Sequence, residues 1–237
     1  LRKKDTMLME QAILAQLGEM INMIAHQWRQ PLNAISGAAV ELSLLNAMGS
    51  ISKEKIDHNT RFTQEIARKM SHTIDEFMDF NKNTDISNFS LLEIVRKTAN
   101  MVMPQFKSRS IALQIHIDEG LTVFHNEAAV KHALLNILIN SRDAFEEQTY
   151  NDTCKISIYT QEKKNATVLL IEDNAGGIAL NIIKKVFNPY FSTKEQGKGT
   201  GLGLYMTKKM IEKVKKSTVS VESQDNKTVF KIKFPVQ

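Results

Sequence analysis

The sequence has 237 residues, of which 42% are hydrophobic and 24% charged, so it can bury the core of one large or two modest domains. The net charge of +5 comes largely from lysines between residues 208 and 216 that alternate with apolar residues, which favours a solvated helix face over nucleic-acid binding. No stretch approaches the roughly 18 apolar residues of a membrane span, and the single cysteine, Cys154, excludes an intrachain disulfide, so we expect a cytoplasmic setting.

The first third of the chain is predicted to be a helical hairpin. Apolar residues follow a three-four spacing from Leu17 to Leu45 and again from Ile56 to Phe80, and the segment 48–52 between them contains a glycine and is predicted to be the turn. One hairpin offers too few facing layers to bury two such stripes. We therefore expect a homodimer in which two hairpins form a four-helix bundle.

One histidine of the first predicted helix lies away from its apolar stripe. On a helical wheel His26 is opposite that stripe and faces solvent, and Pro31, little more than one turn later, removes a backbone donor and is expected to bend the helix. An imidazole with a pKa of about 6.5 is mostly neutral and nucleophilic at neutral pH. Taken alone, the pattern also fits an ordinary surface histidine beside a helix kink tolerated for packing.

A polar run at residues 81–88 interrupts the helical period and is expected to link two domains. The predicted domains are a helical hairpin at 1–82, a linker at 83–88 and an α+β sandwich at 89–237. The expected elements of the sandwich are a helix at 91–103 that stops at Pro104, a strand at 111–117, a helix at 126–145 capped by Asn126, strands at 155–159 and 167–172, a helix at 202–215, and strands at 218–222 and 229–234.

Polar residues of the second domain indicate a nucleotide site. Asn136 and Asn140 share one face of a predicted helix, where they can offer an oxygen to Mg²⁺ and amide hydrogens to phosphate. Asp173 ends a predicted apolar strand and can accept the amino group of adenine, and the glycines at 176–177 let the backbone approach the base. A glycine-rich run at 197–204 precedes a predicted helix, whose N-terminus can bind phosphate. Each pattern alone is a weak signal.

Together these segments resemble the sequence boxes of sensor histidine kinases, a family with a GHKL (Bergerat) ATP-binding domain. The resemblance covers about residues 15–236. It rests on Gly18-Glu19-Met20 with His26-Gln27-Trp28-Arg29-Gln30-Pro31-Leu32 for the H-box, Asn136-Ile137-Leu138-Ile139-Asn140-Ser141-Arg142-Asp143-Ala144 for the N-box, Asp173-Asn174-Ala175-Gly176-Gly177 for the G1 box, Phe187-Asn188-Pro189-Tyr190-Phe191-Ser192-Thr193-Lys194 for the F-box, and Gly197-Lys198-Gly199-Thr200-Gly201-Leu202-Gly203-Leu204 for the G2 box.

The resemblance implies that His26 is the phosphoacceptor. The family usually has an acidic residue directly after this histidine, where the chain has Gln27, an amide that can orient the imidazole but cannot take its proton at neutral pH. Gln30 stands where the family usually has a threonine or asparagine that serves dephosphorylation, and it can hold a water there.

The resemblance also implies the nucleotide contacts, with Asn136 on Mg²⁺, Asn140 on the nucleotide and Asp173 on adenine. Some relatives have a phosphate-contacting lysine where this chain has Asp143, and Lys194 is expected to supply that cation instead. The other expected nucleotide-site residues are Gly177 in the G1 box, Gly199, Gly201, Leu202 and Gly203 in the G2 box, and Thr228 in the last strand.

The implied function is that of a sensor histidine kinase core, a homodimer that uses ATP and Mg²⁺ to phosphorylate His26 and passes the phosphoryl group to an aspartate of a response regulator. A nucleotide-binding dimeric scaffold without transfer activity is an alternative that fits the changed residues 27 and 143. A GHKL ATPase of the chaperone or mismatch-repair type fits the nucleotide boxes but leaves His26 and the hairpin without a role. Because residue 1 is leucine, we expect any sensing domain or membrane anchor to lie upstream.

Overall fold

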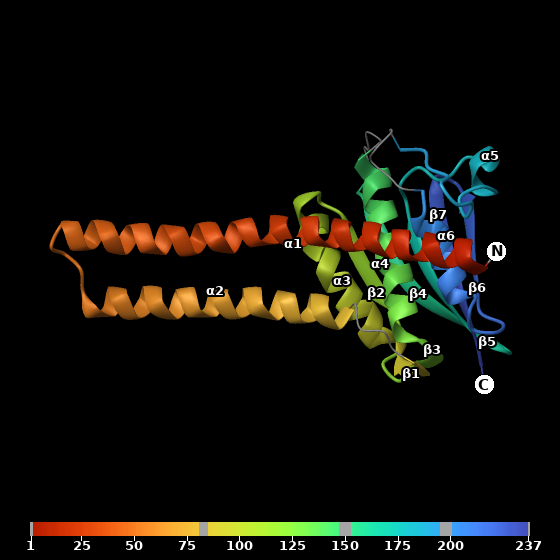
Figure 1. Ribbon diagram of the computed structural model, residues 1–237, viewed down its shortest axis with the longest axis horizontal. Helices are drawn as coiled ribbons and strands as arrows, with labels where there is room; N and C mark the ends of the chain where they lie inside the picture. The colour runs from red at the N-terminus through yellow and green to blue at the C-terminus, as the bar shows by residue number, and fades with distance from the viewer. Residues whose placement is uncertain (1, 81–84, 147–152, 195–200, 237) are drawn as a thin grey trace. The chain divides into compact units, whose positions relative to one another are not determined.

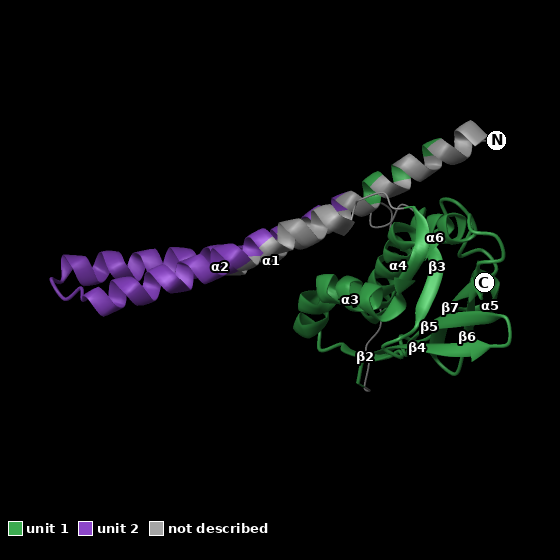
Figure 2. Cartoon of the chain, turned by 90° about the horizontal axis from the view of Figure 1, so that it is seen from below, with its two compact units in different colours: residues 1–16, 83–237 green, residues 17–82 purple. Residues whose placement is uncertain are grey.

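The computed structural model describes residues 2–80, 85–146, 153–194 and 201–236, and in parts of its first two helices the backbone alone. The chain divides into two compact units (Figure 2). Residues 17–82 form the two-helix unit, and residues 1–16 with 83–237 form the α/β unit. Residues 1–16, which the sequence analysis assigns to the hairpin domain, thus group with the α/β unit.

The elements follow one another as two long helices and then a mixture of strands and helices (Figure 1). In chain order they are α1 (Arg2–Ala47), α2 (Lys53–Phe80), β1 (Ile86–Ser90), α3 (Leu91–Ser108), β2 (Ala112–His116), β3 (Thr122–Asn126), α4 (Glu127–Glu146), β4 (Lys155–Lys163), β5 (Ala166–Asp173), α5 (Leu180–Ile183), α6 (Gly203–Ile211), β6 (Thr218–Gln224) and β7 (Lys227–Pro235).

A short glycine turn joins α1 and α2, where the sequence predicts it. Gly49 has a φ of 65°, the left-handed conformation that ends many helices, and the amide of Ser50 donates to the carbonyl of Leu45 at 2.9 Å. The hydroxyl of Ser52 accepts from the amide of Lys55 at 3.3 Å and so caps the start of α2. Upstream of the turn, α1 continues as one helix through Pro31.

Near the turn, the two helices are joined by polar contacts. Asn59 of α2 is only 3% exposed, and its amide donates to the carboxylate of Glu41 on α1 at 3.3 Å. The ammonium of Lys55 donates to the other oxygen of Glu41 at 2.8 Å. Among the side chains described in these helices, the buried apolar one is Ala38, so the apolar stripes predicted from sequence are only partly covered.

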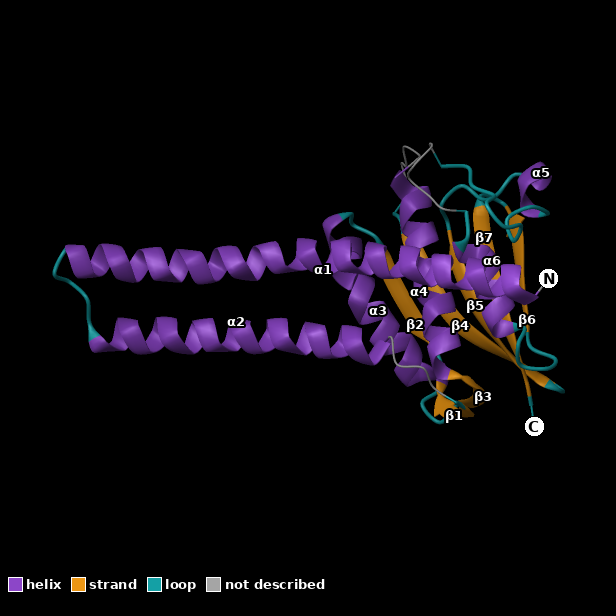
Figure 3. Ribbon diagram, viewed as in Figure 1, coloured by secondary structure: helices purple, strands orange, loops and turns teal. Residues whose placement is uncertain are grey.

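The α/β unit is built on a five-stranded sheet with the order β2-β4-β5-β7-β6 (Figure 3). β2 pairs with β4 in parallel, and the remaining neighbours pair antiparallel. Helices α3, α4 and α6 cover one face of this sheet, while β1 and β3 form a separate two-stranded sheet (Figures 2 and 3). This is the α+β arrangement of strands gathered under one layer of helices that the sequence predicts.

The core lies between the helices and that face of the sheet. Alternate residues of β7 and of the first half of β4 are buried, as period-two strands require, whereas the central strand β5 is buried along nearly its whole length. His125 at the end of β3 is fully buried, and its Nε2 lies 3.0 Å from the carbonyl oxygen of Ile211 at the end of α6. The largest fully buried side chains of the core are Leu91, Phe106, Leu134, Leu135, Ile137, Leu138, Ile156, Ile158, Leu169, Ile171 and Phe234.

Pro104 does not end a helix, contrary to the prediction from sequence. α3 continues to Ser108, with Pro104 inside it and exposed. Proline removes one hydrogen bond, at a cost of about 3 kcal/mol, but Val102 and Phe106 on either side of it are fully buried. Burial of this apolar face offsets the lost hydrogen bond and carries the helix past the proline.

Two short strands, β1 and β3, are not predicted from the sequence. β1 and β3 pair with each other, with Ile86 opposite Asn126 and Ser90 opposite Thr122. The predicted linker at 83–88 therefore overlaps β1 at residues 86–88, and its residues 83–84 lie outside the described part of the chain. β1 is mostly polar and exposed, because it forms the edge of a two-stranded sheet and has no buried face to give it an alternating pattern.

Candidate functional site

Asp173 is a buried carboxylate at the end of β5. It is 3% exposed, and its Oδ2 accepts from the hydroxyl of Ser141 on α4 at 2.6 Å. Its Oδ1 accepts from the backbone amide of Ala175 at 3.1 Å. Burial raises the pKa of Asp173, while the hydrogen bonds from Ser141 and Ala175 act in the opposite direction. Thr228 of β7, itself 4% exposed, lies directly opposite Asp173 in the sheet.

Asn136 of α4 packs against the start of α6. Its Nδ2 donates to the hydroxyl of Thr207 at 3.1 Å. Its side chain also fills the space beside Gly203, because a Cβ added there would overlap the amide oxygen of Asn136. Glycine at 203 is therefore required by the close approach of α4 and α6. Asn140, one turn further along α4, is partly exposed.

Asp143 and Lys194 form an ion pair that joins α4 to the loop after α5. Both side chains are partly covered, with 16% of Asp143 and 24% of Lys194 exposed. The other carboxylate oxygen of Asp143 accepts from Nε of Arg142 at 2.7 Å, and Arg142 in turn donates to the side-chain oxygen of Gln105 on α3. The loop is thus tied to two helices of the α/β unit.

Just before α6, the glycine-rich run passes close to the backbone of Tyr190. Gly201 has a φ of 64°, and a Cβ there would lie 2.5 Å from the carbonyl carbon of Tyr190. Leu202 is 4% exposed and packs in a cluster with Ala129 of α4 and Met206 of α6. Gly199 lies outside the described residues.

The loop after β5 is tied to the turn between β6 and β7. Gly176 and Gly177 have φ values of 83° and 77°. The amide of Gly176 donates to the carbonyl of Asn226 at 3.0 Å, and the amide of Ile178 donates to the hydroxyl of Ser223 at 2.7 Å. No local pattern in the sequence indicates a role for Ser141 or Ser223, because their hydrogen-bond partners are 32 and 45 positions away along the chain.

These contacts bring most of the predicted nucleotide residues together around α4. The residues that belong to α4 or contact it are Asn136, Asn140, Asp143, Asp173, Lys194, Leu202 and Gly203. Thr228 lies opposite Asp173, Gly201 lies against Tyr190, and Gly177 lies against Ser223. His26, Gln27 and Gln30 lie in α1, and their side chains fall outside the described part of the structure. Across the described residues, no group of three or more His, Cys, Asp and Glu side chains is placed to hold a metal ion.

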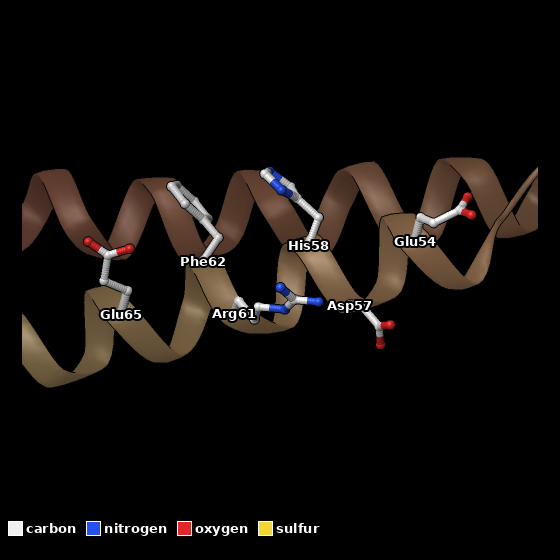
Figure 4. A pocket seen from close by; sticks show the side chains of 6 residues that line it. All are labelled: Glu54, Asp57, His58, Arg61, Phe62 and Glu65. Atoms are coloured by element: carbon white, nitrogen blue, oxygen red, sulfur yellow. The ribbon is translucent and has the colours of Figure 1, made fainter.

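A separate open pocket lies along α2 in the two-helix unit (Figure 4). All of its lining residues belong to one face of that helix, and His58 and Phe62 project to the same side. They are Glu54, Asp57, His58, Arg61, Phe62 and Glu65. Within the described residues, no helix has the length and apolar character of a membrane span.

Comparison with protein families identifies the larger part of the α/β unit. Residues 125–237 match the family described as histidine kinase-, DNA gyrase B- and HSP90-like ATPases. The match includes α4, β4–β7 and α6, and so takes in every described residue of the candidate site.

Curated relatives align with both units. The chain is 30% identical to the sensor protein DegM of Bacillus sp. (strain B21-2) and 31% identical to the signal transduction histidine-protein kinase AtoS of Escherichia coli (strain K12). The alignments cover 83% and 89% of this chain but 52% and 33% of DegM and AtoS. The chain therefore spans about half the length, or less, of these relatives.

Solved structures of histidine kinases share the fold. The catalytic domain of the histidine kinase ThkA has a TM-score of 0.56 and 25% identity, and the match covers 64% of this chain and 95% of that domain. A structure of ThkA in complex with the response regulator protein TrrA matches 94% of this chain and 63% of that one, with a TM-score of 0.54. The identity of 22% in this second case shows a common fold alone.

Proposed function

Since the chain is related to the sensor histidine kinases and its residues 125–237 form a domain of the histidine kinase-, DNA gyrase B- and HSP90-like ATPase family, we propose that it is the kinase core of such a sensor. The α/β unit binds ATP, His26 accepts the γ-phosphoryl group, and an aspartate of a response regulator receives it. The observation that carries the proposal is the position of α4, which contacts the other three nucleotide motifs through Asn136, Ser141 and Asp143.

Asp173 is suited to bind the adenine base. A carboxylate has about four lone-pair positions, and Asp173 uses its oxygens on Ser141 and the amide of Ala175. Acceptor capacity remains for the exocyclic amine of adenine. Thr228 lies opposite Asp173 and can add a hydroxyl at the same end of the site. The left-handed backbone of Gly177 lets the loop after Asp173 lie close against β6 at this end of the site.

The start of α6 and Lys194 are suited to bind the phosphates. Backbone amides at the N-terminus of a helix attract anions, and the segment Gly201–Gly203 leads into α6. The ion pair with Asp143 keeps the ammonium of Lys194 beside α4, near Asn140, which lies three residues before Asp143. A cation is therefore available at this place, although α4 itself has an acid at position 143. Lys194 thereby supplies the charge that the resemblance would place on α4.

Asn136 fits the role of a Mg²⁺ ligand. Mg²⁺ prefers oxygen and usually keeps several waters, so one protein oxygen beside the phosphates is sufficient. Because Nδ2 of Asn136 donates to Thr207, its amide oxygen is turned toward Gly203 at the phosphate end. When bound, Mg²⁺ would neutralise part of the charge on the phosphates. Asn140, one turn away on the same helix, is free to contact the nucleotide itself.

In the phosphoryl transfer, a nitrogen of His26 forms a bond to the γ-phosphorus while the bond to the bridging oxygen of ADP breaks. The imidazole proton leaves to water or to a phosphate oxygen, because the amide of Gln27 is not a base. Gln27 then orients the ring, and Gln30, one turn on, can hold the water that reverses the modification. Positioning and electrostatics supply most of the catalysis in reactions of this class.

The two-helix unit is proposed to pair with a second copy as a four-helix bundle. Its exposed apolar side chains need a partner, because hydrophobic area in contact with water is unfavourable. Phe62, in the open pocket of α2, is 40% exposed and is accompanied by the charged residues Arg61 and Glu65, which suit the rim of such an interface (Figure 4). The large apolar residues exposed between positions 32 and 56 are Leu32, Val40, Leu44, Met48 and Ile56.

Labelling with ATP tests the proposal. Incubation with [γ-³²P]ATP and Mg²⁺ should give protein whose label is lost in acid, as expected of phosphohistidine. His26→Gln should reduce this label to background while ATP binding is retained. His58→Gln, which changes an exposed histidine of α2 in the same way, should keep the label.

Each alternative gives a different outcome in this assay. Label that persists in His26→Gln would remove His26 as the acceptor. Binding of ATP without any label would favour a nucleotide-binding scaffold. Steady hydrolysis of ATP without phosphoprotein would favour a GHKL ATPase.

A further inference from the structure

Ser223 lies in line with Asp173 across three neighbouring strands. Asp173 of β5 is opposite Thr228 of β7, and Thr228 is opposite Ser223 of β6. Residues directly opposite in an antiparallel pair lie on the same face of the sheet. Ser223 therefore shares the helix-covered face with Asp173, although it lies 50 positions later in the chain.

The hydroxyl of Ser223 bridges two segments of backbone. It accepts from the amide of Ile178 at 2.7 Å and donates to the carbonyl of Lys227 at 3.0 Å. A serine hydroxyl can donate one hydrogen bond while it accepts another, so both contacts are satisfied together. One end of the bridge is the loop that follows Asp173, and the other is the first residue of β7.

The side chain of Ser223 also abuts Gly177. A Cβ added at Gly177 would lie 2.7 Å from the hydroxyl oxygen of Ser223, whereas the next nearest atoms are 3.6 Å away. The loop thus approaches β6 so closely that only glycine fits. Contact and hydrogen bond together hold residues 177–178 against the sheet.

The partner of the loop is itself a rigid turn. Asp225 and Asn226 have φ values of 52° and 62°, as in the two-residue turns that match the twist of a β-hairpin. The carbonyl of Asn226 accepts from Gly176, and the ammonium of Lys227 lies 2.8 Å from the carboxylate of Glu172. These two contacts tie the β6–β7 turn to the end of β5 and to the loop that follows it, so the turn can hold the loop in place.

We infer that Ser223 is a positioning residue that sets the conformation of the Asp173–Ile178 loop for adenine binding, without contacting the nucleotide. The inference rests on the proposed ATP site. Because Ser223 acts at the adenine end, its loss should weaken ATP and ADP equally. Catalysis at saturating ATP should be unaffected, since no phosphate contact changes.

Nucleotide titration of the whole chain tests this inference. Ser223→Ala should raise the Kd for ATP and for ADP by the same factor, about fivefold to tenfold, which is the effect of one hydrogen bond. It should raise the KM for ATP in autophosphorylation by a similar factor and leave kcat unchanged. Ser220→Ala is the matched control, since Ser220 lies on the same strand but on the exposed face.

The amide of Ile178 provides a measurement that does not depend on ATP. Its hydrogen exchange, followed by NMR, should become faster in Ser223→Ala and stay unchanged in Ser220→Ala. A loss of affinity for ATP but not ADP, equal effects of the two variants, or unchanged exchange at Ile178 would overturn the role of Ser223. If the unmodified protein binds neither ATP nor ADP, the proposed function itself fails. If the wild type binds both and Ser223→Ala binds them with unchanged affinity, only the role of Ser223 fails.

Gly177 gives an independent check from the other side of the contact. Gly177→Ala should weaken ATP binding strongly, because of its left-handed backbone and the overlap with Ser223. In the Ser223→Ala background the overlap is removed, so Gly177→Ala should raise the Kd for ATP by a smaller factor than it does in the wild type. Strictly additive effects of the two substitutions would contradict the proposed contact.

Discussion

The α/β unit and the two-helix unit differ in how completely they bury their side chains. In the α/β unit, large residues such as Phe106 and Phe234 are at most 1% exposed, and buried polar groups such as Asp173 have partners. In the described part of the two-helix unit, Val40 and Leu44 are 55% and 59% exposed. The first unit has a closed hydrophobic core of its own, whereas the second leaves apolar area for another surface to cover.

Because of this difference, the stability of the two units should depend on different solution conditions. Stability of the α/β unit should respond to the protonation of its buried groups, since their pKa values are shifted by burial. Stability of the two-helix unit should respond to protein concentration, since the proposed association would cover its exposed stripe. The two units can therefore be perturbed one at a time.

Acid should unfold the α/β unit first, and His132 should make the largest contribution. Burial lowers the pKa of His132 from 6.5 to about 4. Because the folded pKa is lowered, the unfolded chain binds the proton first, and stability falls as pH drops from 6.5 toward 4. The loss should be about 3 kcal/mol, and His132→Gln should reduce the pH dependence of denaturant unfolding.

Exposed His116 on β2 provides the control for this pH dependence. His116→Gln should leave the acid sensitivity of unfolding unchanged. Equal sensitivity in the wild type and His132→Gln would argue against a neutral, buried His132. Acid unfolding that begins in α2 would break the contrast between the units.

Asp173→Asn should have the next largest effect, confined to ATP binding. Loss of a charged acceptor should cost about 2 kcal/mol, or roughly 30-fold in the Kd for ATP. The thermal midpoint should not fall, because burial raises the pKa of Asp173 and so disfavours its charged form in the folded state. Calorimetric titration and thermal unfolding measure the two effects.

The same raised pKa predicts how ATP affinity changes with pH. Affinity should decline, as pH is lowered, at a higher pH than an ordinary aspartate would give, since protonated Asp173 is a poorer acceptor. Glu162→Gln changes an exposed acid at the other end of the β4–β5 pair and should leave this decline in place. Unchanged ATP affinity in Asp173→Asn would contradict the adenine assignment.

Leu44→Glu should have the smallest effect, and only on association. A charge on this exposed position of α1 should weaken the proposed dimer about tenfold, because it must be desolvated in the interface. Sedimentation equilibrium would measure the change, and the Kd for ATP should not move. A dimer as stable as that of the wild type would show that the stripe containing Leu44 is not the interface.

The sequence predicts those parts of the fold whose pattern is local. The turn at Gly49 follows from glycine between two helical stripes, and the cap of α4 is confirmed because the side-chain oxygen of Asn126 accepts from the amide of Ala129 at 2.7 Å. Strands β4, β5 and β7 include the predicted strands at 155–159, 167–172 and 229–234, and each extends beyond them. The helix through Pro104 was missed because the burial of Phe106 is a tertiary effect.

The candidate site was predicted as a set of motifs but not as a set of contacts. The sequence motifs include both Asp143 and Lys194, yet nothing local indicates that they form an ion pair across 51 positions. Ser141 was overlooked because its partner, Asp173, is 32 positions away. The roles assigned to His26, Gln27 and Gln30 remain predictions, because their side chains lie outside the described residues.

The approach of α4 to α6 has a consequence for the order of folding. Thr207 of α6 contacts Asn136 of α4 across 71 positions of sequence, and Gly203 at the start of α6 lies against the same side chain. Long-range contacts of this kind form after local ones, because closing a long loop costs entropy. The phosphate end of the site should therefore be assembled late, after α4 has docked on the sheet.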